Sequence, residues 1–385
     1  KISKIVNIHV GKCGNQIAAR FWQKITSEHG INIWPPTSST DLQNQSLNSY
    51  FRNEFGRLVP RAVLIDLEPG TIDAIRANPV GQLFDAENII CGQFGAGNNW
   101  AKGFYDDGAE LADQVMDAVR TEAERCDALG GFQLFHSLGG GTGSGLGSLV
   151  LAQLREQYPR SILATLSVLP ANRAEIVVEP YNAILSMQHL IQSADSVSFL
   201  QNDTIYDAIK STVMGDVNQR IAEFLSCSTA PQRQGKTSLR KVAVALQPFP
   251  RLHFLSCSFF RDVENLLVGG GAMTNTVKGT SLSSYLVFCG CSRAISELDC
   301  RFDTISVVDS NDSQGAALLN NSTNVANSLQ MSADRFNAMF KRRAFLQYYL
   351  GSGMDDLEFS ESIEKVAELI SEYQLHEVCE IASEE

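Results

Sequence analysis

The sequence predicts an α/β fold in which parallel strands carry a ligand at their carboxyl ends. Apolar strand-like segments alternate with amphipathic helical segments, and several of the connections between them are rich in glycine. The richest connection, residues 139–145, has five glycines, one Thr and one Ser between an apolar segment and a helical one. Such a run brings several backbone N–H groups to one point beside a helix N-terminus, so it predicts a phosphate site.

The glycine run does not follow the spacing of the two common nucleotide-binding motifs. The pattern G-x-G-x-x-G fails because Ser144 or Leu146 stands where its last glycine belongs, and the P-loop pattern fails because no lysine follows. A later Gly235-Lys236-Thr237 has Ala230 in place of the first P-loop glycine. A flexible linker is the remaining alternative, but the apolar strand and helix that flank the run favour a phosphate loop.

An earlier unit of the same kind opens the chain. Residues 5–10 predict a strand, residues 11–16 a glycine-containing loop, and the residues after them an amphipathic helix. The side chains of Lys12 and Gln16 could contact a diphosphate there. The polar stretch at residues 36–53 predicts a loop.

The next strand is predicted at residues 62–67, and two carboxylates, Asp66 and Glu68, stand at its carboxyl end. They could face a hydrated Mg²⁺ beside the phosphates, or they could be turn and helix-cap residues. Residues 95–100 form a third glycine-rich loop. Its Asn98 and Asn99 could bind phosphate or ribose, or could cap the helix predicted at residues 100–119.

After the glycine run, a helix is predicted at residues 146–157 and a strand at residues 161–169. Glu175 and Glu179 fall in the following loop, before a helix that begins at residues 180–182. The carboxyl ends of parallel strands meet at one edge of a sheet. We therefore expect three or more loops to converge on one nucleotide.

Composition limits the classes of partner. With 385 residues the chain can hold two or three domains. Its formal charge of −12 argues against nucleic-acid binding through a general basic surface. The sequence has no run of 18 apolar residues and no signal peptide, so neither a membrane nor secretion is expected.

The nine cysteines are scattered and odd in number, which favours reduced thiols in a cytosolic protein. Cys289-Gly290-Cys291 is the closest pair, and without a nearby His it does not predict a metal site. No His, Cys or Ser constellation accompanies the glycine loops, so a metabolic Rossmann enzyme is disfavoured.

The acidic charge is concentrated at the end of the sequence. Residues 352–385 hold eleven acids and one base, Lys365. A helical stripe is formed by Ile363, Val366, Ala367, Ile370 and Tyr373, with most of the glutamates on the other face. A helix of this kind can pack on the body and present carboxylates to basic partners, although a solvated helix face is the common reading of a charge run.

Taken together, these motifs resemble the tubulin family, and its β-type chains most closely. The resemblance extends over nearly the whole chain except about residues 255–315. The segments that match most clearly are residues 13–17, 61–71, 95–102, 139–145, 178–182, 248–254, 321–323 and 343–346. The β-type character lies in residues 239–241, 339–340 and 353–359. The resemblance implies a Rossmann-type GTP-binding domain (1–203), a core helix with an α+β intermediate domain (204–321), and a C-terminal helical hairpin with an acidic outer face (322–385).

The resemblance also implies a site for GTP or GDP with Mg²⁺. Asp66 and Glu68 would face the metal, with Glu68 as its ligand, while Asn202 and Asn218 would meet the guanine ring, whose edge an amide can match as donor and acceptor. The remaining residues carried over from the family are Gly11, Lys12, Cys13, Gln16, Ser137, Gly140, Gly141, Thr142, Gly143 and Ser144 for the phosphates, Ala96, Gly97, Asn98 and Asn99 beside the γ-phosphate, Glu175 and Glu179 near the ribose, and Met214 at the base.

Four features depart from the family pattern. Lys12 stands where the family has Gln, and Met214 stands where β-type chains stack a Tyr on the base, which leaves a softer sulfur contact. Residues 170–179 are one residue short, so Glu175 is matched to the family's Asp. The region after Phe259 is short by some tens of residues, and the loop for lateral filament contacts has no visible counterpart.

The family mechanism implies that this chain has no catalytic residue of its own. The next subunit along the filament supplies an acid that orients the attacking water, and the equivalent position here is Lys241. A lysine ammonium cannot accept a proton. We therefore expect that this chain does not trigger hydrolysis on its neighbour, and that an α-type partner completes its own site.

The resemblance implies a subunit that polymerises with α-tubulin into cytoplasmic microtubules and binds basic microtubule-associated proteins and motors. Two alternatives stay open. One is a structural tubulin whose nucleotide is neither exchanged nor hydrolysed, in view of Lys12 and Met214. The other is a prokaryotic or archaeal homologue that polymerises by itself.

Overall fold

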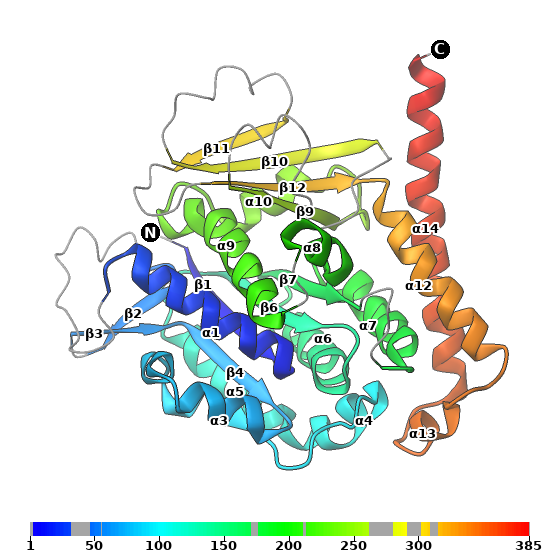
Figure 1. Cartoon of the computed structure of the whole chain (residues 1–385), viewed down its shortest axis with the longest axis horizontal. Helices are drawn as coiled ribbons and strands as arrows, with labels where there is room; N and C mark the ends of the chain where they lie inside the picture. Colours follow the sequence, from blue (N-terminus) through cyan, green and yellow to red (C-terminus); the bar gives the residue numbers. More distant parts are fainter. Residues whose placement is uncertain are drawn as a thin grey trace.

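The computed structural model describes residues 3–31, 47–54, 56–170, 176–210, 213–261, 280–290, 302–308 and 315–384. Within these ranges a ten-stranded sheet runs through the molecule, and helices cover both of its faces (Figure 1). From one edge to the other, the strands are β11 (Thr304–Val308), β10 (Ser281–Cys289), β12 (Gly315–Ser322), β9 (Phe254–Phe260), β8 (Ser196–Gln201), β7 (Ile162–Leu169), β6 (Leu129–Ser137), β1 (Lys4–Val10), β4 (Ala62–Asp66) and β5 (Ile89–Cys91).

The six pairings from β5 to β9 are all parallel, whereas β12 pairs antiparallel with both β9 and β10. The parallel sheet that the sequence predicts is therefore confirmed. The strands of the second half continue the same sheet, because β9 pairs with β8. The domain boundaries at 203/204 and 321/322 stay predictions.

Two predicted segments have a different structure. Part of the predicted loop at residues 36–53 is a strand, because β2 (Phe51–Glu54) pairs with β3 (Arg57–Pro60) in a separate hairpin; residues 36–46 lie outside the described part. The helix predicted at residues 100–119 is two helices, α4 (Trp100–Tyr105) and α5 (Asp107–Glu124). The chain breaks between them at Asp106, whose backbone angles (φ −110°, ψ −107°) are not helical.

Each face of the sheet has its own apolar core. Alternation along β1 sends Ile5 to one face and Val6, Ile8 and Val10 to the other. The Ile5 face is covered by α1 (Gly11–Glu28), α9 (Met214–Arg233) and α10 (Leu239–Leu246), and the opposite face by α5, α6 (Gly147–Gln157) and α7 (Glu179–Ser193). Both faces of the central strands are thus buried, as a parallel sheet requires.

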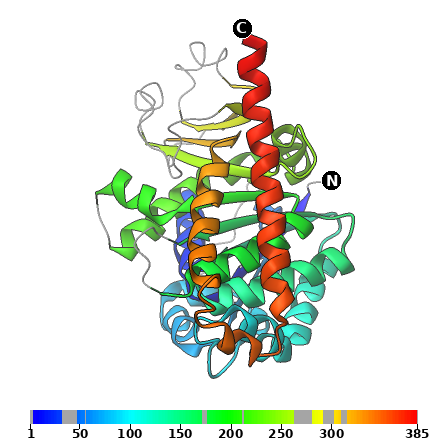
Figure 2. The same ribbon diagram turned by 90° about the vertical axis from the view of Figure 1, so that its right-hand side faces the viewer.

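The C-terminal helical region is also confirmed. Helices α12 (Val325–Phe340) and α14 (Asp356–Glu384) run side by side over α7, with the short α13 (Leu346–Leu350) between them in sequence (Figure 2). In α14, Val366, Ile370 and Tyr373 of the predicted stripe are buried and Ile363 is half-buried, but Ala367 is exposed. The stripe turns further around the helix than predicted, because Leu369 takes the buried position instead.

The acidic face of α14 points to solvent along part of its length. Glu361, Glu364 and Glu368 are exposed. Glu372 is half-buried, and Arg251 donates hydrogen bonds to it and to Glu368. Among the described helices, none is long and apolar enough to cross a membrane.

Candidate nucleotide-binding site

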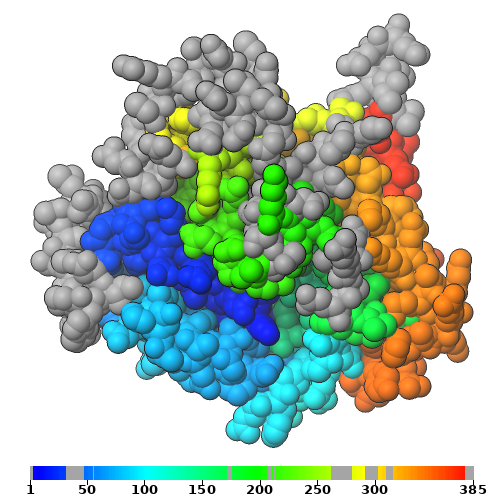
Figure 3. All heavy atoms as spheres, viewed as in Figure 1, coloured from blue at the N-terminus to red at the C-terminus, as the bar shows by residue number. Residues whose placement is uncertain are grey.

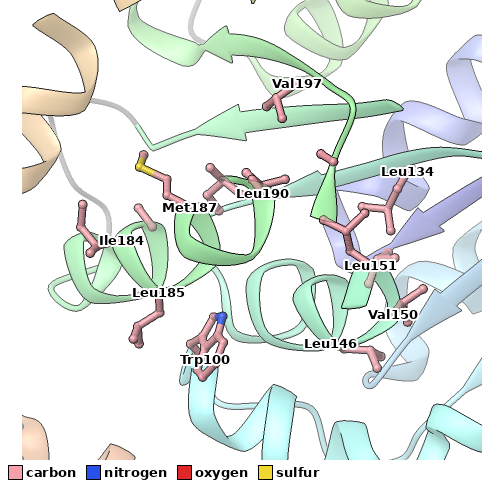
Figure 4. Close-up of a cluster of buried hydrophobic side chains, with 14 of the residues drawn as sticks. Trp100, Leu134, Leu146, Val150, Leu151, Ile184, Leu185, Met187, Leu190 and Val197 are labelled. Atoms are coloured by element: carbon pink, nitrogen blue, oxygen red, sulfur yellow. The ribbon is translucent and has the colours of Figure 1, made fainter. Parts of the chain in front are cut away.

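The predicted phosphate loops all follow parallel strands, so they lie at one edge of the sheet. Strand β6 ends at Ser137, and the glycine run then passes into a π-helical turn at Thr142–Leu146 and into α6. Beneath this turn, Leu146, Val150 and Leu151 pack with Trp100 in the buried core (Figure 4). The apolar core therefore holds the first turns of the helix that follows the glycine run.

Contacts at the glycines show how closely the loops approach one another. A Cβ on Gly11 would lie 2.9 Å from the backbone N of Gly143, and one on Gly141 would lie 2.7 Å from the backbone N of Asn99. A Cβ on Gly139 would lie 3.2 Å from the Cγ of Glu179. The glycine run thus touches the segments after β1 and β5 and the start of α7, and side chains at these positions would push them apart.

The buried His136 supports the glycine run from inside the fold. Its Nδ1 lies 2.8 Å from the carbonyl oxygen of Gly143, and its Nε2 lies 2.8 Å from the hydroxyl of Ser167. Burial lowers the pKa of His136 to about 4, so the ring is neutral. Because a carbonyl only accepts, Nδ1 donates to Gly143 and Nε2 accepts from Ser167.

The segment predicted as a loop at residues 11–16 is instead the first part of α1, which begins directly at Gly11. Gly11 has φ +73°, so one glycine makes the turn for which a loop was expected. Asn15 fixes this junction, because its Nδ2 donates to the carbonyls of Gly11 (3.0 Å) and Ile65 (2.8 Å). In the same helix, the side chain of Lys12 is exposed. Burial raises the pKa of the Cys13 thiol to about 12, so this thiol stays protonated at neutral pH.

Asp66 ends β4 as a buried carboxylate. Its Oδ1 accepts a hydrogen bond from the backbone N of Glu68 (3.4 Å), which is the expected turn contact, but its Oδ2 is buried without a hydrogen-bond partner. Burial raises the pKa of Asp66 to about 6. Glu68 is exposed at the N-cap of α3 (Pro69–Arg76), and its carboxylate makes no cap hydrogen bond. The helix-cap interpretation therefore does not hold for Glu68.

The two asparagines of the third glycine-rich loop, residues 95–100, make different contacts. Asn99 caps α4, since its Oδ1 accepts from the backbone N of Ala101 (3.0 Å), and its Nδ2 donates to the carbonyl of Tyr348 (2.9 Å). Asn98 has a left-handed backbone (φ 57°), and its Oδ1 lies about 4.0 Å from the position a Cβ on Gly140 would take. Asn98 therefore faces the glycine run, whereas the side chain of Asn99 is occupied by the helix cap and by Tyr348.

Asn182 joins these loops, although the sequence analysis gave it no role in the site. Its Nδ2 donates to the carbonyls of Asn98 and Gly139, both at 2.8 Å. Its Oδ1 accepts from the backbone N of Trp100 (3.0 Å) and from the hydroxyl of Tyr349 (2.7 Å). Its side chain is fully satisfied, and it ties two of the predicted phosphate loops to the C-terminal helical region.

Replacing Asn182 with alanine should therefore destabilise the protein by about 3 kcal/mol or more, because four partners, three of them in buried residues, lose a hydrogen bond. Tyr349→Phe removes only one of the four and should cost about 1 kcal/mol. Urea unfolding of both variants measures the difference. Equal losses in the two variants would contradict the role given to Asn182.

A cavity of about 540 Å³ lies beside the start of α1, between α1, α3 and the start of α9, and no residue of the glycine run lines it. Figure 3 shows these segments meeting at the surface, with α1 in dark blue between light blue and green parts of the chain. Five of the predicted site residues line it: Lys12, Gln16, Glu68, Met214 and Asn218. Asn218 donates to the Oε1 of Gln16 (3.2 Å), so two predicted residues from separate elements meet directly.

The other described residues that were predicted to contact the base and the ribose do not line this cavity. Asn202 is the half-buried first residue of α8 (Asn202–Ile209) and does not line the cavity. Glu179 is the first residue of α7 rather than part of a loop, and Glu175 lies outside the described residues. The hydroxyl of Tyr206 lies 3.7 Å from the sulfur of Met214, a neighbour that the sequence analysis missed.

A parallel sheet with glycine-lined loops converging at the carboxyl edge, beside a cavity, defines a nucleotide-binding α/β protein of Rossmann type. Residues 4–210 match the Tubulin/FtsZ family, GTPase domain. The chain is 40% identical to a tubulin beta-3 chain from Oomycete-like sp. (strain MacKay2000) over 97% of its own length and 95% of the relative's. It is 41% identical to a tubulin beta chain from Aspergillus fumigatus over 99% of its length and 96% of the relative's.

The chain therefore belongs to the Tubulin/FtsZ family of GTPases, in its β-tubulin-like branch. Its coarse function follows from the family: it is a β-type tubulin subunit of the microtubule cytoskeleton. The alignment with the first relative extends over 432 positions, although this chain has 385 residues. The match therefore contains gaps in this chain.

Proposed function

We propose that the loops at the carboxyl edge of the sheet bind GTP, with its phosphates on the glycine run and the start of α1. The support is the mutual contact of Gly11, Gly141 and Gly139 with neighbouring loops, which leaves backbone N–H groups gathered without Cβ atoms. Met214 and Asn218 line the adjoining cavity and would hold the guanine base, while Gln16, which accepts a hydrogen bond from Asn218, would contact the phosphates. Asn202 would lie near the base and Glu179 near the ribose.

The same edge fits a magnesium ion. The Oδ2 of Asp66 is buried without a partner, and the exposed carboxylate of Glu68 follows two residues later. Hard carboxylate oxygens are the ligands that Mg²⁺ prefers, usually with waters and phosphate oxygens completing its shell. Bound Mg²⁺ would neutralise phosphate charge, and Asp66 and Glu68 would hold it directly or through water. Among the described residues, no cluster of three or more His, Cys, Asp and Glu side chains gathers to hold an ion without the nucleotide.

One observation supports head-to-tail assembly above all: the nucleotide edge and Lys241 lie at opposite ends of the parallel strands. Arg240, next to Lys241 in α10, donates to the carbonyl of Arg160 (2.8 Å), which lies just before the amino end of β7. The glycine run follows the carboxyl end of the adjacent β6. Figure 1 shows α10 and α4 far apart at these two ends. Stacked subunits would bring one chain's α10 over the next chain's nucleotide.

This arrangement determines which subunit completes which site. The exposed Lys241 would lie over the nucleotide of its neighbour, where an ammonium group offers donors but no acceptor for a proton. The chain would therefore hold its neighbour's GTP unhydrolysed. Its own GTP would be hydrolysed when an α-tubulin partner places an acid over it. The chain thus functions as a GTPase only within the polymer.

Copolymerisation tests this proposal. The purified chain should sediment as polymer with α-tubulin and GTP, and the polymer should contain radiolabelled GDP derived from the nucleotide of this chain. Polymer formed without α-tubulin would instead show a self-assembling homologue. Label retained as GTP throughout assembly would show a structural subunit that does not turn its nucleotide over.

The pKa of Asp66 predicts a pH dependence for magnesium. Burial raises this pKa from 3.8 to about 6, so the folded chain without metal takes up a proton on Asp66 as the pH falls through 6. Protonation of Asp66 stabilises the folded state. This contribution is fully present below pH 3.8 and is lost as the pH rises through 6. Mg²⁺ needs the carboxylate, so its affinity should fall about tenfold per pH unit below 6.

Titration of the Mg²⁺ dependence of GTP binding between about pH 5 and 7 measures this effect. Asp66→Asn should give weaker and nearly pH-independent binding of Mg²⁺. An identical pH profile in the original chain and in the Asp66→Asn variant would show that Asp66 does not face the metal.

We also place this chain in cytoplasmic microtubules, with the outer face of α14 as a docking site for basic microtubule-associated proteins and motors. Replacing the exposed Glu361, Glu364 and Glu368 with Gln should weaken binding of a lysine-rich peptide to the polymer by about tenfold at low salt. Cosedimentation at low and high salt measures this. Unchanged binding at low salt would place the docking site elsewhere.

A further inference from the structure

Two cysteines that the nucleotide site does not use face each other inside the protein. Cys227 lies in α9 and Cys289 is the last residue of β10, and their sulfur atoms are 3.2 Å apart. Both are buried, with 2% and 1% of their surface exposed, and both are free thiols. The two residues are 62 positions apart in sequence, so the fold alone brings them together.

The surroundings direct the two thiols toward each other. The sulfur of Cys227 also lies within hydrogen-bond range of the carbonyls of Val287 (3.5 Å) and Gly315 (3.6 Å), and that of Cys289 lies 3.8 Å from the carbonyl of Cys227. The hydrogen bond from the Cys227 thiol lowers the pKa of Cys289, and the nearby Arg233 lowers it further. Burial raises the pKa of Cys227. Cys289 is thus the better nucleophile of the pair.

We propose that Cys227 and Cys289 form a dithiol site that hydrogen peroxide oxidises to an intramolecular disulfide. Cys289 loses its proton, its thiolate attacks one peroxide oxygen as the O–O bond breaks, and the proton joins the departing hydroxide to form water. The resulting sulfenic acid is attacked at sulfur by Cys227, which releases a second water as the S–S bond forms. The two thiols lose two electrons and two protons, and one peroxide is reduced to two waters.

The position of Cys289 provides a route for the oxidant. Gly290 follows it directly, and the backbone N of Gly290 donates to the carbonyl of Val308 at the end of β11 (3.1 Å). Strand ends open more readily than strand centres, and peroxide is nearly as small as water. Oxidation should therefore be slower than that of a thiol at the surface, and bulky alkylating reagents should not reach the pair in the folded chain.

The bond would connect two parts of the protein with different roles. Helix α9 carries Met214 and Asn218, which line the cavity beside the phosphate loops, whereas β10 lies in the far half of the sheet. Cross-linking residues so distant in sequence restricts the unfolded chain, so the oxidised protein should be harder to unfold. We expect its midpoint of thermal unfolding to rise by several degrees.

Peptide mapping of the full-length chain with its bound nucleotide tests the site. The protein is exposed to graded hydrogen peroxide, quenched, denatured, alkylated with N-ethylmaleimide and digested for mass spectrometry. We expect a cross-linked peptide joining Cys227 to Cys289 that dithiothreitol separates. If Cys227 and Cys289 both carry the alkyl group at doses that oxidise the half-buried Cys91, the proposal is wrong. It is equally wrong if Cys289 stops at a sulfinic acid or if Cys227 pairs with a different cysteine.

Thermal unfolding with and without peroxide provides the second readout. Cys289→Ser should abolish the upward shift, whereas Cys257→Ser, at another buried thiol in β9, should retain it. The mapping of the unaltered chain does not depend on these variants, so a variant that fails to fold leaves the test intact. An equal shift in the Cys289→Ser variant would refute the assignment.

Discussion

Gly11→Ala should weaken GTP binding by about 100-fold or more. The added Cβ would lie 2.9 Å from the backbone N of Gly143, so the start of α1 and the glycine run would have to separate. Gly11 also has φ +73°, a conformation that costs an alanine about 1 kcal/mol or more. Overpacking adds about 1–3 kcal/mol, and each 1.4 kcal/mol lost from binding is about tenfold in affinity.

Equilibrium binding of a fluorescent GTP analogue measures this effect, and Gly30→Ala is the matched control. Gly30 has a similar backbone conformation (φ +60°), but a Cβ there would meet nothing within 4 Å. The control should lose some stability and keep its nucleotide affinity. A Gly11→Ala variant that binds GTP as tightly as the Gly30→Ala variant would show that the start of α1 and the glycine run do not form one phosphate site.

Lys241→Glu should make the nucleotide trapped on the neighbouring subunit hydrolysable, with a rate increase of about 100-fold or more. A positioned acid or base contributes about 10²–10⁴ to proton-transfer steps, and a glutamate can orient water where a lysine cannot. The residue is exposed in the first turn of α10, and its backbone N donates to the Ser238 cap (3.4 Å), so the helix should tolerate the change.

The ratio of GDP to GTP in assembled polymer, separated by chromatography, provides the measurement. Arg240→Glu is the control, because it changes the charge by the same amount one residue away, although it also removes the hydrogen bond to Arg160. Only Lys241→Glu should raise the GDP content. An unchanged ratio, or an equal rise in both variants, would show that Lys241 does not lie over the nucleotide of the neighbouring subunit.

The sheet and the phosphate loops were predictable from sequence because each depends on local patterns. Apolar runs marked β1, β4, β6 and β7, and glycines marked positions where backbone approaches backbone. Gly141 and Gly143 are examples, since a Cβ on either would come within 2.8 Å of another loop or strand. Amphipathic spacing likewise indicated the packed side of α14.

Other features depend on tertiary contacts that no local pattern encodes. Asn182 looks like an ordinary residue in the first turn of a helix, yet it joins Asn98, Gly139 and Tyr349. Asn99 had two possible roles in sequence, and the position of Tyr348 decides in favour of the cap. The pairing of Cys227 with Cys289 arises only when β10 packs on α9.

The start of α1 and the break at Asp106 were not predicted, because each depends on the backbone geometry at a glycine. A glycine followed by polar residues is typical of a loop, but the φ of +73° at Gly11 lets the helix begin at once. The helical pattern of residues 100–119 shows no break, yet a Cβ on Gly108 would lie 1.7 Å from the carbonyl oxygen of Gly103. The two helices approach there in a way that only glycine permits.

The central claim is that glycine-lined loops at the carboxyl edge of the sheet hold a guanine nucleotide. Extraction of the purified chain with acid, followed by ion-exchange chromatography, tests it most directly. We predict one GTP or GDP per chain, with the amount falling sharply in the Gly11→Ala variant. A chain that releases no nucleotide, or that releases an adenine dinucleotide, would contradict it.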